Sequence, residues 1–104
     1  MAGPERQPGG EVSEKTRPKT QKPRLYKVIL HNDDYTTMQF VVEVLESVFH
    51  KSPAQAYRIM MLVHTQGQGT CGAYTYEVAE TKVGLVYDRA RDQGYPLRAS
   101  MEEA

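Results

Sequence analysis

Apolar and polar side chains follow two different periods along most of the chain, and the changes of period predict its elements. Residues 25–30 are rich in β-forming side chains and stop at the polar run 32–34, which predicts a strand followed by a loop. Apolar side chains then recur every 3.6 residues, which predicts a first helix from about Thr37 to about His50. Thr36 stands three residues before Gln39, the spacing of a capping box at the start of that helix.

Similar signals mark the second half of the chain. A Ser-Pro start signal and a second apolar stripe predict a helix over residues 53–66. Residues 70–76 alternate as a half-buried strand does, and a third helix is predicted over residues 78–93, with Gly94 as its C-terminal stop. Residues 97–101 complete the series as a last strand.

The predicted order β-α-α-β-α-β indicates the fold class. Most connections contain too few residues for the crossovers that parallel strands require. We therefore expect an α+β domain in which a small, three-stranded, largely antiparallel sheet is packed with three helices. No internal repeat is visible in the sequence.

Two segments of different composition divide the chain. Residues 1–23 hold four of the six prolines and three glycines, and their apolar residues are only Met1, Ala2 and Val12. Such a segment buries too little surface to offset its ordering entropy, which predicts a disordered, mildly basic N-terminal extension. Residues 24–104 are then expected to form one compact domain.

Composition and charge exclude several classes of protein. Lysine plus arginine and aspartate plus glutamate both total 13, so no overall positive field favours nucleic acid. The single cysteine, Cys71, has no partner for an internal disulfide or a zinc-binding Cys pair, which fits a reducing compartment. The sequence also lacks a long apolar run and a signal-peptide pattern. We therefore expect a cytoplasmic protein that binds neither membranes nor nucleic acid.

Three features are candidates for function: the polar run 32–34 at a strand end, Met38 in the following helix turn, and a group on the second helix. That group is Met60, Val63 and His64, which a spacing of three and four residues places on one side of the helix. Each feature also has a structural explanation. Asn-Asp-Asp is common in solvated turns, methionines at helical spacing often fill cores, and a single histidine often lies at a core boundary.

Two further sites can be drawn from the same residues. Cys71, His64 and Asp34 offer the thiol, base and orienting group of a small cysteine hydrolase, although a thiol in a central strand usually behaves as a buried apolar group. A metal site could be built from Asp33, Asp34, His50 and His64. The sequence indicates it only weakly, because the acidic run lacks the alternating ligand spacing of a calcium loop. We expect neither catalysis nor a metal or other cofactor.

Taken together, several motifs resemble the ClpS family. Residues 28–36 (VILHNDDYT) are similar to its strand-to-helix signature, and residues 60–64 (MMLVH) to its second-helix motif. Residues 71–75 (CGAYT) and 77–82 (EVAETK) resemble its most distinctive stretch. The resemblance extends in order over residues 25–104.

The resemblance implies an adaptor of the bacterial N-degron pathway. Such a protein binds substrates with Phe, Tyr, Trp or Leu at the N-terminus and delivers them to the unfoldase ClpA for degradation by the ClpAP protease. By resemblance, Asn32, Asp34 and His64 contact the substrate's α-ammonium group. The chemistry agrees, because an ammonium group has three donors and one positive charge and therefore needs several acceptors at one point.

The resemblance also implies an apolar pocket and a docking surface. The pocket positions are Thr36, Met38, Met60, Val63 and Leu97. Met38 is expected to crowd the pocket mouth, which would explain why the family rejects Ile and Val. Thr37 stands where many members have proline, a difference that bears on which side chains the pocket admits. Glu77 and Lys82 are implied contacts of the ClpA N-terminal domain, and the unfoldase is expected to engage residues 1 to about 20 during delivery.

Overall fold

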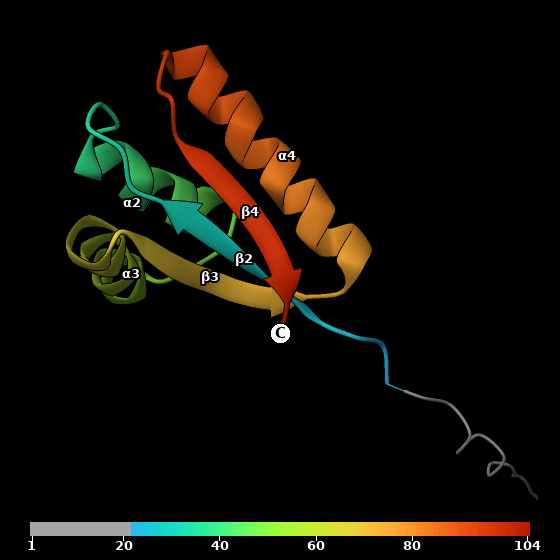
Figure 1. Cartoon of the computed structure of the whole chain (residues 1–104). Coiled ribbons are helices and arrows are strands. Elements are labelled where there is room, and N and C mark those ends of the chain that lie inside the picture. Colours follow the sequence, from blue (N-terminus) through green and yellow to red (C-terminus); the bar gives the residue numbers. More distant parts are fainter. Residues whose placement is uncertain (1–21) are drawn as a thin grey trace, which may run out of the picture.

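The computed structural model describes residues 22–104, in which six elements follow one another (Figure 1). They are β2 (Tyr26–His31), α2 (Met38–Ser47), α3 (Pro53–Gln66), β3 (Gln68–Tyr74), α4 (Tyr76–Gln93) and β4 (Arg98–Glu103). This order confirms the predicted α+β fold of three strands and three helices. The predicted disordered extension and its engagement by an unfoldase concern residues that, up to position 21, lie outside the described part of the chain.

The sheet has the strand order β3-β2-β4, and both neighbours run antiparallel to the central strand β2. Val28 lies opposite Gly72 on β3, whereas the next residue, Ile29, lies opposite Thr70. Cys71 is therefore an extra residue on β3, which makes a β-bulge. The sheet is antiparallel throughout, as predicted.

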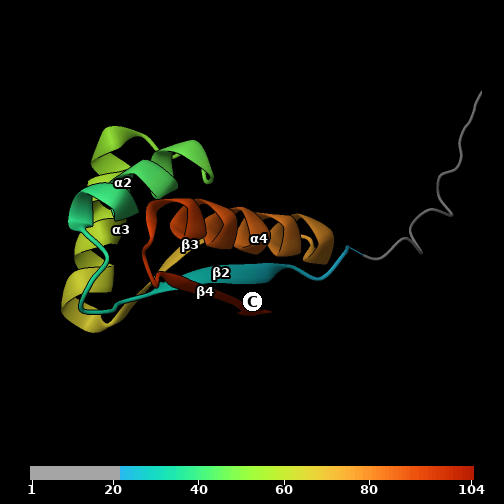
Figure 2. The same ribbon diagram turned by 90° about the horizontal axis from the view of Figure 1, so that it is seen from above.

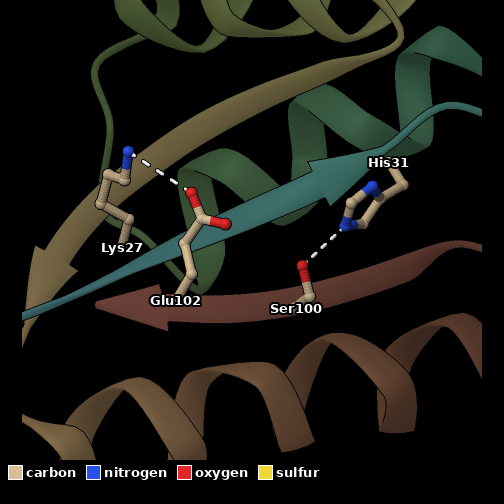
Figure 3. Close-up of polar contacts among 4 residues, drawn as sticks. All are labelled: Lys27, His31, Ser100 and Glu102. Atoms are coloured by element: carbon tan, nitrogen blue, oxygen red, sulfur yellow. Dashed lines mark hydrogen bonds and ion pairs between the residues drawn. The ribbon is translucent and has the colours of Figure 1, made fainter. Parts of the chain in front are cut away.

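All three helices lie on one side of the sheet (Figure 2). Figure 3 shows polar contacts on the sheet, where Lys27 pairs with Glu102 at 3.5 Å and His31 bonds Ser100 at 2.7 Å. Since side chains alternate along β2, Lys27 and His31 face away from the helices. The core residues between sheet and helices are Val28, Leu30, Phe40, Val41, Val44, Leu45, Val48, Phe49, Ala56, Met60, Val63, Cys71, Ala79, Val86, Ala90, Leu97 and Ala99.

Close packing of α3 against β3 fixes where α3 ends. A Cβ on Gly69 would lie 2.9 Å from Val63 Cγ2 and 3.2 Å from the Ile59 carbonyl oxygen, so a side chain here would push the helix away. Gly67 ends α3 in the left-handed conformation, with φ of 89°. The Gly67 carbonyl accepts a 2.9 Å hydrogen bond from the Asn32 N–H, which ties the loop after β2 to the end of α3.

The start of α2 differs from its prediction by one residue. Thr37 is the N-cap, and its Oγ1 accepts from the Phe40 N–H at 3.1 Å. Thr36, predicted as the capping residue, instead donates its hydroxyl to Asp33 Oδ2 at 2.7 Å. A stronger acceptor in the preceding loop therefore occupies the Thr36 side chain, and the next hydroxyl caps the helix.

The end of α2 also differs from the predicted boundary near His50. The helix ends at Ser47, and His50 adopts a positive φ of 55°, which is incompatible with a continuing right-handed helix. The Lys51 N–H then bonds the Leu45 carbonyl at 3.1 Å. Apolar periodicity continued past the true end because Val48 and Phe49 are still core residues. The predicted bounds 53–66 of α3 are confirmed.

Candidate functional site

A cavity of about 260 Å³ lies where β2 ends, α2 begins and α3 ends. The loop from β2 to α2 runs past the C-terminal end of α3 at this point (Figure 2). The lining residues are Asn32, Asp33, Asp34, Thr36, Met38, Val41, Met60, Val63 and His64. The fold thus brings together, from three separate elements, most of the positions that the sequence predicts for substrate binding.

Three polar groups of the cavity carry hydrogen-bond acceptors. Asn32 and Asp34 come from the loop after β2, and His64 comes from the last turn of α3. All three are exposed, and within residues 22–104 their side chains make no hydrogen bond or ion pair. A carboxylate, an amide oxygen and a neutral imidazole nitrogen all accept hydrogen bonds. They therefore form an acceptor set suited to a small cation with several donors.

Asp33 plays a different part from its neighbour Asp34. Its Oδ1 accepts from the backbone N–H groups of Tyr35 at 2.8 Å and Thr36 at 2.7 Å, and Oδ2 accepts from the Thr36 hydroxyl. Burial works to raise the pKa of Asp33, but these hydrogen bonds outweigh it and hold the pKa below its ordinary value. Asp33 therefore shapes the loop, whereas Asp34 remains available to a ligand.

Apolar side chains form the other wall of the cavity. Met60, Val63 and Val41 are buried, whereas Met38 is 43% exposed and is the first residue of α2. Sequence reasoning missed Val41, although its spacing of three residues from Met38 places the two on one side of α2. Leu97 is 2% exposed within the core and does not line the cavity, so its assignment to the pocket stays a prediction.

The alternative of a cysteine hydrolase finds no support in the structure. Cys71 is 1% exposed and does not line the cavity that holds His64 and Asp34. Burial raises the pKa of the Cys71 thiol to about 12, so the reactive thiolate is not populated near neutral pH. Nor does any group of three His, Cys, Asp or Glu side chains within residues 22–104 come together as metal ligands would.

A larger depression of about 560 Å³ lies between α2 and α4. Its lining residues are Phe40, Glu43, Val44, Glu46, Ser47, Arg89, Asp92 and Gln93. Arg89 Nη1 crosses it to donate to Ser47 Oγ at 3.0 Å. The smaller cavity is nevertheless the better candidate site, because it joins a buried apolar wall to several acceptors that have no partner in the described fold.

The two predicted docking residues lie in very different surroundings on α4. Glu77 is exposed in the first turn, where a negative charge complements the helix dipole. Lys82 is half-buried, and its Nζ donates to the Val48 carbonyl at 2.7 Å. That ammonium group also lies 5.2 Å from the ring centre of Tyr74 and 5.8 Å from that of Phe49. Within residues 22–104 the Glu77 side chain makes no hydrogen bond or ion pair, whereas Lys82 already fixes the end of α2.

In the described part of the chain, no helix has the length and apolar character needed to cross a membrane.

Comparisons with known proteins agree on one family. The family described as "ATP-dependent Clp protease adaptor protein ClpS" matches residues 21–100. The ATP-dependent Clp protease adapter protein ClpS of Maricaulis maris is 59% identical over 95 residues, 91% of this chain and 87% of that protein. The protein of the same name from Caulobacter vibrioides strain NA1000 / CB15N is 57% identical over 95 residues, with the same coverage of 91% and 87%.

A solved structure gives the same answer for the fold. The structure of Agrobacterium tumefaciens ClpS2 bound to L-phenylalaninamide superposes with a TM-score of 0.77 and 38% sequence identity, over 80% of this chain and 100% of that one. The resemblance found in the sequence motifs is confirmed by these matches. This chain therefore belongs to the ClpS family of adaptor proteins of the ATP-dependent Clp protease.

Proposed function

We propose that this adaptor captures proteins through a free N-terminus that carries Phe, Tyr, Trp or Leu, and delivers them to a ClpA-type unfoldase. One observation carries the proposal: a single cavity joins the acceptors of Asn32, Asp34 and His64 to a buried apolar wall. An N-terminal residue presents this same combination, a cation with three donors beside a side chain. The adaptor itself then needs no catalytic group.

The polar side of the cavity is suited to an α-ammonium group. Asp34 supplies the opposite charge, while Asn32 and His64 accept the remaining N–H groups. Because these side chains have no other partners in the described fold, binding replaces water and breaks no internal hydrogen bond. An internal amide of a peptide chain has neither the charge nor the three donors, so the set favours chain ends over interior positions.

The apolar side of the cavity is suited to a bulky side chain. The related ClpS2 of Agrobacterium tumefaciens was solved with L-phenylalaninamide, a compound that has a free α-amine and a phenyl group. Met60, Val63 and Val41 offer the corresponding apolar wall here, and flexible thioethers adapt to flat rings and to branched leucine. We propose that Met38 crowds the mouth near the ligand's β-carbon, so that Ile and Val are rejected.

For delivery, we propose that the N-terminal domain of the unfoldase docks on the start of α4, through Glu77 and Lys82, in the bacterial cytoplasm. The two sites are then separate, since Glu77 and Lys82 do not line the cavity. Glu77→Ala is expected to weaken association with the isolated ClpA N-terminal domain while peptide affinity stays constant. A matched substitution on the same helix, Asp88→Ala, serves as the control.

The proposal is tested with fluorescent peptides that differ only at residue one. Peptides that begin with Phe, Tyr, Trp or Leu are expected to bind, and those that begin with Ile, Val or Ser are not. Acetylation of the Phe peptide should remove its binding, because it eliminates the charge and two donors. If the acetylated and free peptides bind equally well, the cavity does not read a free N-terminus.

A further inference from the structure

The C-terminal end of α4 holds the N-terminal end of α2, which carries part of the cavity. Tyr95 follows the Gly94 cap of α4, and its N–H donates to the Ala90 carbonyl at 2.8 Å. Its ring packs on Phe40 with the ring centres 4.8 Å apart and the planes tilted by 41°. Tyr95 is thus fixed by its backbone to one helix and by its ring to the other.

One hydroxyl group completes this connection. Thr37 Oγ1 accepts from the Phe40 N–H at 3.1 Å, which caps α2, and donates to Tyr95 Oη at 3.4 Å. Because the same oxygen makes both contacts, the orientation of the cap and the position of the Tyr95 ring depend on each other. The first turn of α2 is therefore restrained from a point 58 residues away in sequence.

Met38 directly follows this restrained residue. Its side chain is 43% exposed and lines the cavity, so packing around the side chain constrains it much less than it constrains Met60 or Val63. The position of Met38 is then set mainly by the backbone of the first turn, which Thr37 and Tyr95 hold. A change in that turn moves the methionine relative to the two buried residues of α3.

We propose that Thr37 and Tyr95 are positioning residues that set the width of the cavity mouth through Met38, and so determine how strongly β-branched N-terminal residues are excluded. The inference rests on the proposed function of the cavity. Ile and Val branch at the β-carbon and carry a methyl group there, close to the α-ammonium group, whereas Leu branches one carbon further out. A fixed Met38 excludes that methyl group, and a frayed first turn accommodates it.

Variants at both ends of α2 separate this role from general stability. Thr37→Val removes both contacts of the hydroxyl and keeps the side-chain shape, whereas Thr37→Ser retains the hydroxyl. Tyr95→Phe removes only the Thr37 contact and keeps the ring on Phe40. The matched control is Ser47→Ala, which removes a hydroxyl that accepts from Arg89 at the opposite end of α2.

The measurement is the ratio of affinities for a Leu peptide and an Ile peptide. Thr37→Val should lower this ratio about fivefold, the effect of losing one helix cap on the population of the ordered turn. Thr37→Ser, which keeps the hydroxyl, and Ser47→Ala, the control, should each leave the ratio at its wild-type value. Introduced into the wild-type protein, Tyr95→Phe should lower the ratio about twofold. Introduced into the Thr37→Val variant, it should not lower the ratio further.

Two results would overturn the inference: an unchanged ratio in Thr37→Val, or an equal loss in Ser47→Ala. Failure of the proposed function looks different, since the wild-type protein would then bind no Leu peptide. In that event the restraint is judged from amide hydrogen exchange at Phe40, whose N–H donates to Thr37. Exchange there should be faster in Tyr95→Phe, which keeps the Thr37 cap, than in Ser47→Ala, and equal rates would dismiss the restraint as well.

Discussion

The two ends of α2 differ in how tightly internal contacts enclose them. At the C-terminal end, the half-buried ammonium group of Lys82 donates to the Val48 carbonyl at 2.7 Å and lies 5.8 Å from the ring centre of Phe49. At the N-terminal end, Met38 is 43% exposed and the contact from Thr37 Oγ1 to Tyr95 Oη is 3.4 Å long. Internal partners hold both ends of the helix, but at the cavity end the first side chain of α2, that of Met38, is left largely exposed.

The same contrast separates two adjacent carboxylates. Asp33 accepts three hydrogen bonds from its own loop, whereas Asp34 makes none within residues 22–104. One carboxylate therefore stabilises the fold and the other is available for recognition. Substitution of a residue such as Asp33 should therefore reduce stability, and substitution of a residue such as Asp34 should reduce binding.

The largest effect is expected for Asp34→Ala. Removing the carboxylate leaves a bound α-ammonium group without its opposite charge, which should weaken binding of a Phe peptide at least about 100-fold, or about 3 kcal/mol. Stability should stay within about 0.5 kcal/mol, because the side chain has no partner in the described fold. Fluorescence anisotropy and urea denaturation measure the two quantities. If Asp34→Ala lost as much unfolding free energy as binding free energy, Asp34 would be a structural residue like Asp33.

Substitution of His64 is expected to have the next largest effect. In the proposed complex the imidazole accepts one N–H of the ligand's ammonium group. His64→Ala should therefore weaken binding of a Phe peptide about tenfold, and His64→Asn, which retains an acceptor, should recover part of that loss. Fluorescence anisotropy measures both affinities. Equal affinities of the wild-type protein and His64→Ala, with circular dichroism unchanged, would contradict the role of His64 as an acceptor.

At the other end of α2, Lys82→Met should act on the fold. The methionine keeps an apolar stem over the rings of Tyr74 and Phe49 but removes the hydrogen bond to the Val48 carbonyl. The free energy of unfolding is expected to fall by about 1 kcal/mol. Lys27→Met, at an exposed ion pair, is the control and should cost less. Urea denaturation gives both values. Peptide affinity should not change, and a large loss of affinity would mean that the two ends of α2 are coupled.

The smallest effect is expected for Asp33→Asn, which should lower the free energy of unfolding by about 0.5 to 1 kcal/mol. Asn retains one acceptor oxygen but no longer accepts the Thr36 hydroxyl. Because the folded-state pKa of Asp33 is lowered, its stabilisation is complete above the ordinary aspartate pKa and is lost as pH falls through the folded-state value. The difference between wild type and variant should therefore disappear in acid. A constant difference from pH 7 to about pH 2 would refute this account.

The sequence by itself determined the elements, their order and the family. Periods of 2 and 3.6 residues reflect which side chains face the core, and this information lies within a few neighbouring residues. The motif around Asn32, Asp34 and His64 could be found by resemblance, and the fold places these three side chains at one cavity. Their functional roles remain predictions.

Tertiary structure alone decided how individual side chains are used. Nothing local shows that Lys82 reaches a carbonyl 34 residues earlier in the chain, or that Thr37 meets Tyr95, which lies 58 residues later. The capping role moved from Thr36 to Thr37 for a local reason, because Asp33, three residues earlier, occupies the Thr36 hydroxyl. The contacts of Lys82 and Tyr95, in contrast, depend on distances between segments far apart in the sequence, which are set only when the helices pack on the sheet.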